Sequence, residues 1–169
     1  MIHQLVGHVT SEQINAILEI IKNQYRDYLR FTGSRDFERL FATEYAPHNR
    51  QFCVSWAISS AFPSGRNINN DLYVSRLEYG RGHTRPVISN ESIELHILNK
   101  TTDFEAEYLK ERYLLNSNHF SADKLFAYFR FGVENRKLVD VRLCLPDETG
   151  KIIAEEVLLD RRTILSWAA

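Results

Sequence analysis

The segment from Arg76 to Arg85 carries the densest group of side chains able to do chemistry. It reads Arg-Leu-Glu-Tyr-Gly-Arg-Gly-His-Thr-Arg. Gly80 and Gly82 allow left-handed backbone conformations, so the flanking arginines can present amide and guanidinium donors to a phosphate or a carboxylate. The segment therefore predicts an Arg/Gly-rich loop that recognises a phosphate-bearing ligand, a nucleic acid or an acidic protein surface. The candidate ligand-binding residues are Arg66, Arg76, Arg81, His83 and Arg85.

A solvated hairpin loop explains the same segment without any ligand. Exposed charges are common in such loops, and the arginines would then pair with the neighbouring acids Glu78 and Glu91. Arg66 follows the turn at 63–65, on the opposite connection of a strand predicted over 71–79. It reaches the loop only if the sheet curls.

Asp71, Glu94 and His96 form the second candidate constellation. Asp71 begins a predicted strand, while Glu94 and His96 share one face of another strand because side chains alternate across it. The pattern resembles the Asp…Glu-x-Lys arrangement of the PD-(D/E)xK nucleases, in which two acids hold a divalent metal and the lysine supports an attacking water. It departs from that family in having His96 where lysine is expected, and no proline precedes Asp71.

The resemblance implies a metal-dependent phosphodiesterase or nuclease as the alternative function. Asp71, Glu94 and His96 would be catalytic, a divalent metal would be the cofactor, and Arg81 or Arg85 would hold the scissile phosphate. The other interpretation is that Glu94 and His96 mark the solvent side of a half-exposed strand.

Missing motifs disfavour several enzyme classes. The sequence has no Gly-x-Ser-x-Gly elbow, no Walker-type lysine loop and no dinucleotide fingerprint. Its six histidines form no zinc-binding spacing. Cys53 and Cys144 lie far apart in apolar runs, which predicts two buried thiols; neighbouring strands that pair them on oxidation are the alternative.

These observations favour a non-enzymatic binding, regulatory or inhibitor protein over an enzyme. Every catalytic set is incomplete, whereas a recognition loop needs only residues that are present. No cofactor is expected unless the metal site forms, and a protein or a nucleic acid is the expected partner. A third hypothesis is a homo-oligomeric structural or interaction subunit that associates through aromatic surface.

The charge balance limits the kind of partner. With 21 Lys and Arg against 22 Asp and Glu, the formal net charge is −1, which argues against coating nucleic acid through bulk charge. No run approaches the roughly 18 apolar residues of a membrane span. The first ten residues contain no Lys or Arg and too short an apolar stretch for a signal peptide. A cytoplasmic location is therefore expected.

The predicted elements give one α+β domain over residues 1–169, a length that fits a single core. Thr10 and Gln13 form a capping box, and apolar side chains at helical spacing continue to about residue 30, where Gly33 ends the helix. Further helices are predicted over 34–47, 102–115 and 161–169. Strands are predicted over 52–61, 71–79, 92–98, 124–132, 138–145 and 151–158. The last three are expected to form a meander, with a turn over 134–137 between the first two of them. The expected architecture is a mostly antiparallel sheet of five to six strands with two N-terminal helices and one inserted helix.

Overall fold

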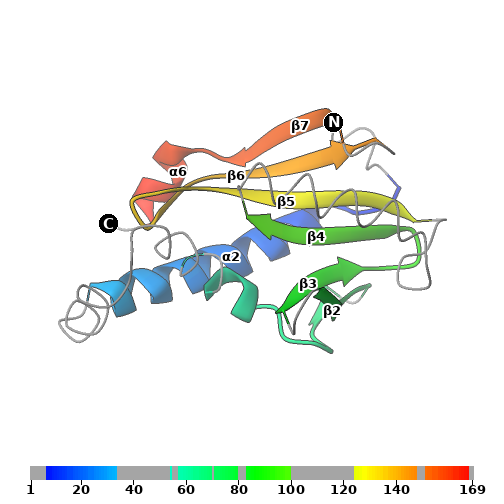
Figure 1. Cartoon of the computed structure of the whole chain (residues 1–169), viewed down its shortest axis with the longest axis horizontal. Helices are drawn as coiled ribbons and strands as arrows, with labels where there is room; N and C mark the ends of the chain where they lie inside the picture. The colour runs from blue at the N-terminus through cyan, green and yellow to red at the C-terminus, as the bar shows by residue number, and fades with distance from the viewer. Residues whose placement is uncertain are drawn as a thin grey trace.

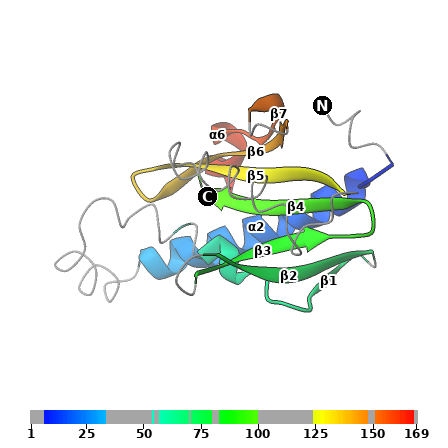
Figure 2. The same ribbon diagram turned by 45° about the vertical axis from the view of Figure 1, so that its right-hand side comes forward.

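The computed structural model describes residues 7–33, 54, 57–69, 71–79, 83–99, 124–147 and 151–167. Among these residues, seven strands form one sheet in chain order, and α2 lies along one face of it (Figures 1 and 2). Neighbouring strands are antiparallel except β4 and β5, which are parallel. The elements are α2 (Ser11–Thr32), β1 (Asn67–Ile68), β2 (Leu72–Tyr79), β3 (His83–Ser89), β4 (Ile93–Asn99), β5 (Leu125–Glu134), β6 (Lys137–Pro146), β7 (Ile152–Leu159) and α6 (Arg161–Ser166). This architecture is compatible with the predicted α+β class, although the sheet has seven strands rather than five or six.

α2 begins and ends as its sequence predicts. The Thr10 side chain accepts a hydrogen bond from the Gln13 amide, and the Gln13 side chain accepts one from the Thr10 amide, so the capping box is confirmed. At the other end the Gly33 amide donates to Leu29 O. Buried apolar side chains at three- and four-residue spacing then face the sheet. They are Ile14, Ile17, Ile21, Tyr25 and Tyr28.

The C-terminal meander is also confirmed. β5, β6 and β7 pair antiparallel in sequence order, and the β5–β6 turn falls within the predicted residues 134–137. Its two central residues, Asn135 and Arg136, have φ values of 47° and 65°, which is the left-handed backbone that two-residue hairpins use. α6 follows Asp160, whose carboxylate accepts a hydrogen bond from the Thr163 amide, and this bond lowers the pKa of Asp160.

Two predictions between residues 52 and 91 are wrong. The strand predicted over 52–61 is helical at residue 54 and at 57–60, because an apolar run without clear period fits a buried helix as well as a strand. The segment 76–85 contains the end of β2 and the start of β3, not one loop. Pro86 lies within β3 and obscured that strand in the sequence.

Some predictions fall outside the described residues. These are the helices over 34–47 and 102–115, and the burial of Cys53. Cys144 is buried, as predicted. Within the described part of the chain, no helix is long and apolar enough to cross a membrane.

The sheet buries side chains on both faces. The face toward α2 holds the apolar core, to which β4 and β5 contribute Leu95, Ile97, Phe129 and Phe131. The opposite face also contains buried side chains, but several of them are polar or ionisable, including Glu94, His96 and Tyr128. The structure therefore separates an apolar layer from a layer with chemistry-bearing groups.

Candidate functional site

Three arginines of the predicted recognition set donate hydrogen bonds to backbone carbonyls within the fold; they are Arg66, Arg76 and Arg85. Arg76, in β2, places Nη1 at 3.3 Å from Ser59 O and 3.2 Å from Phe62 O. Arg66 donates from Nη1 to Ala61 O at 2.7 Å. These carbonyls belong to the end of the helical segment and the turn after it, where carbonyls lack helical partners.

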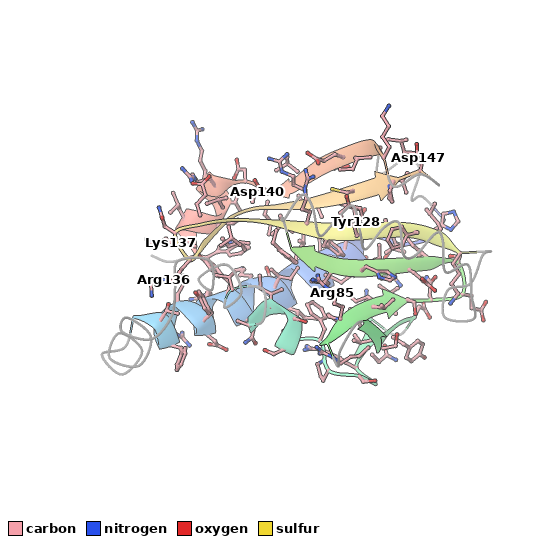
Figure 3. All side chains as sticks on the ribbon, in the orientation of Figure 1. Arg85, Tyr128, Arg136, Lys137, Asp140 and Asp147 are labelled. Atoms are coloured by element: carbon pink, nitrogen blue, oxygen red, sulfur yellow. The ribbon has the colours of Figure 1, made fainter. Side chains whose placement is uncertain are left out.

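Arg85 also donates to the backbone. It is half-buried in β3, and its Nη1 lies 3.4 Å from Ile97 O in β4; Figure 3 labels it beside these strands. His83 opens β3, with a side chain outside the described part, and Arg81 lies outside the described residues altogether. The three described arginines of the predicted set thus connect neighbouring segments of the fold.

Glu94 and His96 are in contact and buried. The carboxylate Oε2 of Glu94 lies 3.4 Å from Nε2 of His96, and the two residues are 7% and 0% exposed. The His96 ring meets the Phe126 ring edge-on, with 4.8 Å between centroids. The interpretation of these residues as the solvent side of a half-exposed strand is therefore wrong.

Asp71 does not join this pair. Tyr73, two residues after it, pairs with Ser89, which in turn pairs with Glu94. Asp71 is thus two strands away from Glu94, roughly 12 Å between Cα atoms at ordinary strand spacings. Among the described residues, no three His, Cys, Asp or Glu side chains are grouped so that they could hold a metal ion.

Asp71 instead lines an open pocket of about 730 Å³ at one end of the sheet. The walls come from the chain before α2 and its first turn, the start of β2, the β3–β4 connection and the residue before β5. Tyr73 also lines the pocket and leaves 54% of its surface exposed. The lining residues are Gly7, His8, Val9, Thr10, Gln13, Asp71, Tyr73, Ser89, Asn90, Glu91, Ser92 and Lys124.

Asn90 builds the frame of this pocket. Its Oδ1 accepts hydrogen bonds from the amides of Ser92 at 2.8 Å and Ile93 at 2.9 Å. Its Nδ2 donates to His8 O at 2.9 Å. One side chain therefore fixes the β3–β4 connection and ties it to the segment before α2. The first turn of α2 forms a further wall, and there Thr10 and Gln13 already hydrogen-bond each other in the capping box.

The charged side chains of the pocket, unlike Asn90, form no ion pair or hydrogen bond that holds the described residues together. Asp71 and Glu91 are exposed, Lys124 is half-buried, and none of them forms an ion pair with the described residues. The predicted pairing of the arginines with Glu91 is therefore wrong, and the side chain of Glu78 lies outside the described part. His8 adds a ring nitrogen, Nδ1, that is enclosed and has no hydrogen-bond partner.

A second polar cluster, on β5, β6 and β7, has the opposite character because its charges are paired. Glu155 accepts hydrogen bonds from Arg130 and Arg142, and Arg142 Nε also donates to Asp140 Oδ1 at 3.1 Å. The Sγ of Cys144 lies 3.6 Å from Glu155 Oε2. We call these five residues the paired network.

The pKa values of the paired network reflect this arrangement. The hydrogen bonds to Asp140 and then Glu155 raise the pKa of Arg142. Burial acts to raise the pKa of Glu155, but the hydrogen bond from Arg142 and the charges of Arg130 and Arg142 outweigh it, so that pKa lies below its ordinary value. Both shifts favour the charged forms, which keeps the network ionised near neutral pH.

Sequence reasoning found Asp71 but missed His8, Glu91 and Lys124 as its neighbours. Each stands at the end of an element, and only the sheet order brings the four together. Asn90 carries a usable signal, because an Asn whose side chain caps the amides two and three residues later is a common turn former. Comparison with protein-family models, curated proteins and solved structures gives no match for this chain.

Proposed function

We propose that this chain is a binding protein whose pocket, at the end of the sheet where α2 begins, takes a small ligand bearing both an ammonium group and an acidic group. The observation that carries the proposal is that charges of both signs line one pocket and form no ion pair with the described residues. Asp71 and Glu91 offer two carboxylates, and Lys124 offers one ammonium group.

The charge pattern selects the ligand class. A simple anion such as phosphate would meet two carboxylates for one lysine, and a simple amine would meet Lys124. A ligand with both groups can pair its ammonium with Asp71 or Glu91 and its acidic group with Lys124. The acidic group is a carboxylate or a phosphate, so a phosphate-bearing ligand, as the sequence suggests, belongs to this class.

The remaining lining suits the same kind of molecule. The volume of about 730 Å³ falls in the range of small-molecule sites. Tyr73 provides an exposed ring for the apolar part of a ligand, and the enclosed His8 Nδ1 offers one further hydrogen-bonding atom. Since Asn90 and the capping box fix the walls, the pocket does not have to fold around its ligand.

A comparison of one compound with its two halves tests the proposal. Isothermal titration calorimetry would measure binding of O-phosphoethanolamine against ethanolamine and inorganic phosphate, and binding of glycine against methylamine and acetate. At least one of the two zwitterions should bind, and each corresponding half should bind at least tenfold more weakly. If neither zwitterion binds, or if inorganic phosphate binds as tightly as phosphoethanolamine, the proposed ligand class is wrong.

Matched variants place the binding in the pocket. Asp71→Asn and Lys124→Met each remove one charge with little change in shape, and each should weaken binding at least tenfold. Lys151→Met is the control, because Lys151 is an exposed lysine outside the pocket lining. Equal weakening by the control would contradict the assignment to this pocket.

A further inference from the structure

Asp71 and Tyr73 stand side by side in the wall of the pocket. Residues 71–74 alternate in burial, with Asp71 and Tyr73 exposed and Leu72 and Val74 buried. Because side chains alternate across an extended chain, Asp71 and Tyr73 lie on the same side of β2, with their Cα atoms about 7 Å apart. A ligand group that pairs with Asp71 is therefore held beside the Tyr73 ring.

The neighbouring strands leave much of Tyr73 exposed. Its direct partners in the sheet are Asn67 in β1 and Ser89 in β3, and directly opposed residues share a face of the sheet. Both partners have shorter side chains than Tyr73, which leaves 54% of its surface exposed. The ring thus offers part of its surface to a molecule in the pocket.

The remaining lining offers little to an aliphatic ligand. Among the described residues that line the pocket, Val9 has the only aliphatic side chain, whereas His8 and Tyr73 carry planar rings. The other lining residues are small, polar or charged. An aliphatic ligand body would find few apolar atoms to pack against, but a planar ring can stack on Tyr73.

The pocket is also large for the smallest zwitterions. A volume of about 730 Å³ is in the range of sites that enclose drug-sized molecules, so a molecule as small as glycine would leave most of it to water. A ring fills part of that volume, and burial of its apolar surface adds affinity that the charged groups alone do not supply.

The charge of Lys124 distinguishes between the two kinds of acidic group. A carboxylate carries a single negative charge, which matches one ammonium group. A phosphate monoester carries a charge closer to −2 near neutral pH, and in this pocket it would also face the carboxylates of Asp71 and Glu91. A carboxylate is therefore the better partner for Lys124.

We propose that the ligand of this pocket is an aromatic α-amino acid. Its ammonium pairs with Asp71, its carboxylate pairs with Lys124, and its ring stacks on Tyr73. In such a molecule two carbon atoms separate the ammonium from the ring, which suits the neighbouring positions of Asp71 and Tyr73 on β2. This inference rests on the proposed function, because it specifies the ligand class of the same pocket.

Calorimetry with amino acids that differ only in the side chain tests the inference. Phenylalanine should bind at least tenfold more tightly than alanine, because it buries a ring. Cyclohexylalanine has similar apolar bulk but no aromatic face, and it should bind about threefold more weakly than phenylalanine. Phenylalanine that binds no more tightly than alanine or cyclohexylalanine would overturn the inference.

The same series separates this inference from the proposed function. If glycine or O-phosphoethanolamine binds in the pocket and phenylalanine binds no more tightly than alanine, the aromatic ligand is wrong and the zwitterion class is retained. If none of these compounds binds, both are wrong.

Variants of exposed aromatic residues locate the ring contact. Tyr73→Leu should remove the preference for phenylalanine over cyclohexylalanine, whereas Tyr73→Phe keeps a ring and should keep the preference. Phe31→Leu is the matched control, because Phe31 is also 54% exposed and lies outside the pocket lining. A preference that survives Tyr73→Leu, or that is lost in Phe31→Leu, would show that the ligand ring does not stack on Tyr73.

Discussion

The pocket and the paired network contain similar residue types but use them differently. In the paired network, Glu155 is held by Arg130 and Arg142, so its charge is consumed within the fold. In the pocket, Asp71, Glu91 and Lys124 line the same cavity and form no ion pair with the described residues. The difference separates charges that hold strands together from charges that remain available to a ligand.

The two regions should respond differently when a charge is removed. Removing a charge that is already paired should lower stability and leave binding unchanged. Removing a charge of the pocket, which forms no ion pair with the described residues, should leave stability unchanged and weaken ligand binding. The frame of the pocket, built by Asn90, is the intermediate case, because its hydrogen bonds are structural although the residue lines the site.

Asn90→Ala should have the largest effect on stability. The substitution removes the acceptor of the Ser92 and Ile93 amides and the donor to His8 O. Loss of these hydrogen bonds should lower the free energy of unfolding by about 2 to 3 kcal/mol. Urea unfolding followed by circular dichroism would measure it. An unchanged midpoint would show that the pocket frame is not held by Asn90.

Gly132→Ala should come next, and it breaks the paired network by crowding. A Cβ on Gly132 would lie 2.7 Å from Oδ1 of Asp140, the carboxylate that Arg142 holds. Moving that carboxylate should lower the free energy of unfolding by about 1 to 2 kcal/mol. Thermal unfolding measures the change, and binding of a pocket ligand to the folded variant should be retained. A variant as stable as the parent would contradict the tight packing at this position.

Glu155→Gln should have a smaller effect that depends on pH. Because the folded-state pKa of Glu155 is lowered, its contribution is fully present above about pH 4.3, the ordinary value, and is lost as pH falls through the folded-state pKa. The variant should be less stable by about 1 kcal/mol at pH 7, as for other partly exposed pairs. Urea unfolding at pH 7 and pH 3 should show this difference shrinking; a difference that persists at low pH would contradict the assigned role.

Asp71→Asn and Lys124→Met should have the smallest effect on stability. Neither side chain forms an ion pair with a residue that the structure describes, so the free energy of unfolding should change by less than about 0.5 kcal/mol. Differential scanning calorimetry without ligand measures this. A loss above 1 kcal/mol would show that these charges are structural, and the contrast between the two regions would fail.

The sequence predicts the parts of the fold whose signals are local. α2 follows from Thr10, Gln13 and regular apolar spacing, and the meander follows from alternation and the turn at 134–137. The helical segment at 57–60 was missed because apolar runs do not distinguish a buried helix from a strand. β3 was missed because Pro86 is unusual in an inner strand.

The candidate site was predicted less completely than the fold, because its residues are far apart in the sequence. Asp71 stands out in the sequence by its position before a strand, but its neighbours in space come from three other segments: the one before α2 and its first turn, the β3–β4 connection and the residue before β5. Likewise, an arginine on the surface and an arginine donating to a carbonyl look alike in sequence, as Arg76 illustrates. Residue type and local spacing indicate which groups could do chemistry, while sheet order decides which of them meet.

The most direct test of the central claim is a ¹⁵N chemical-shift titration of the folded chain with O-phosphoethanolamine and, separately, with glycine. At least one of the two compounds should cause saturable shifts in the amides of the pocket lining, such as Gly7, Asp71 and Ser92. Amides of the paired network, such as Arg142 and Glu155, should not move. Shifts centred on the paired network or on the β2–β3 hairpin, or no shift with either compound, would contradict the central claim.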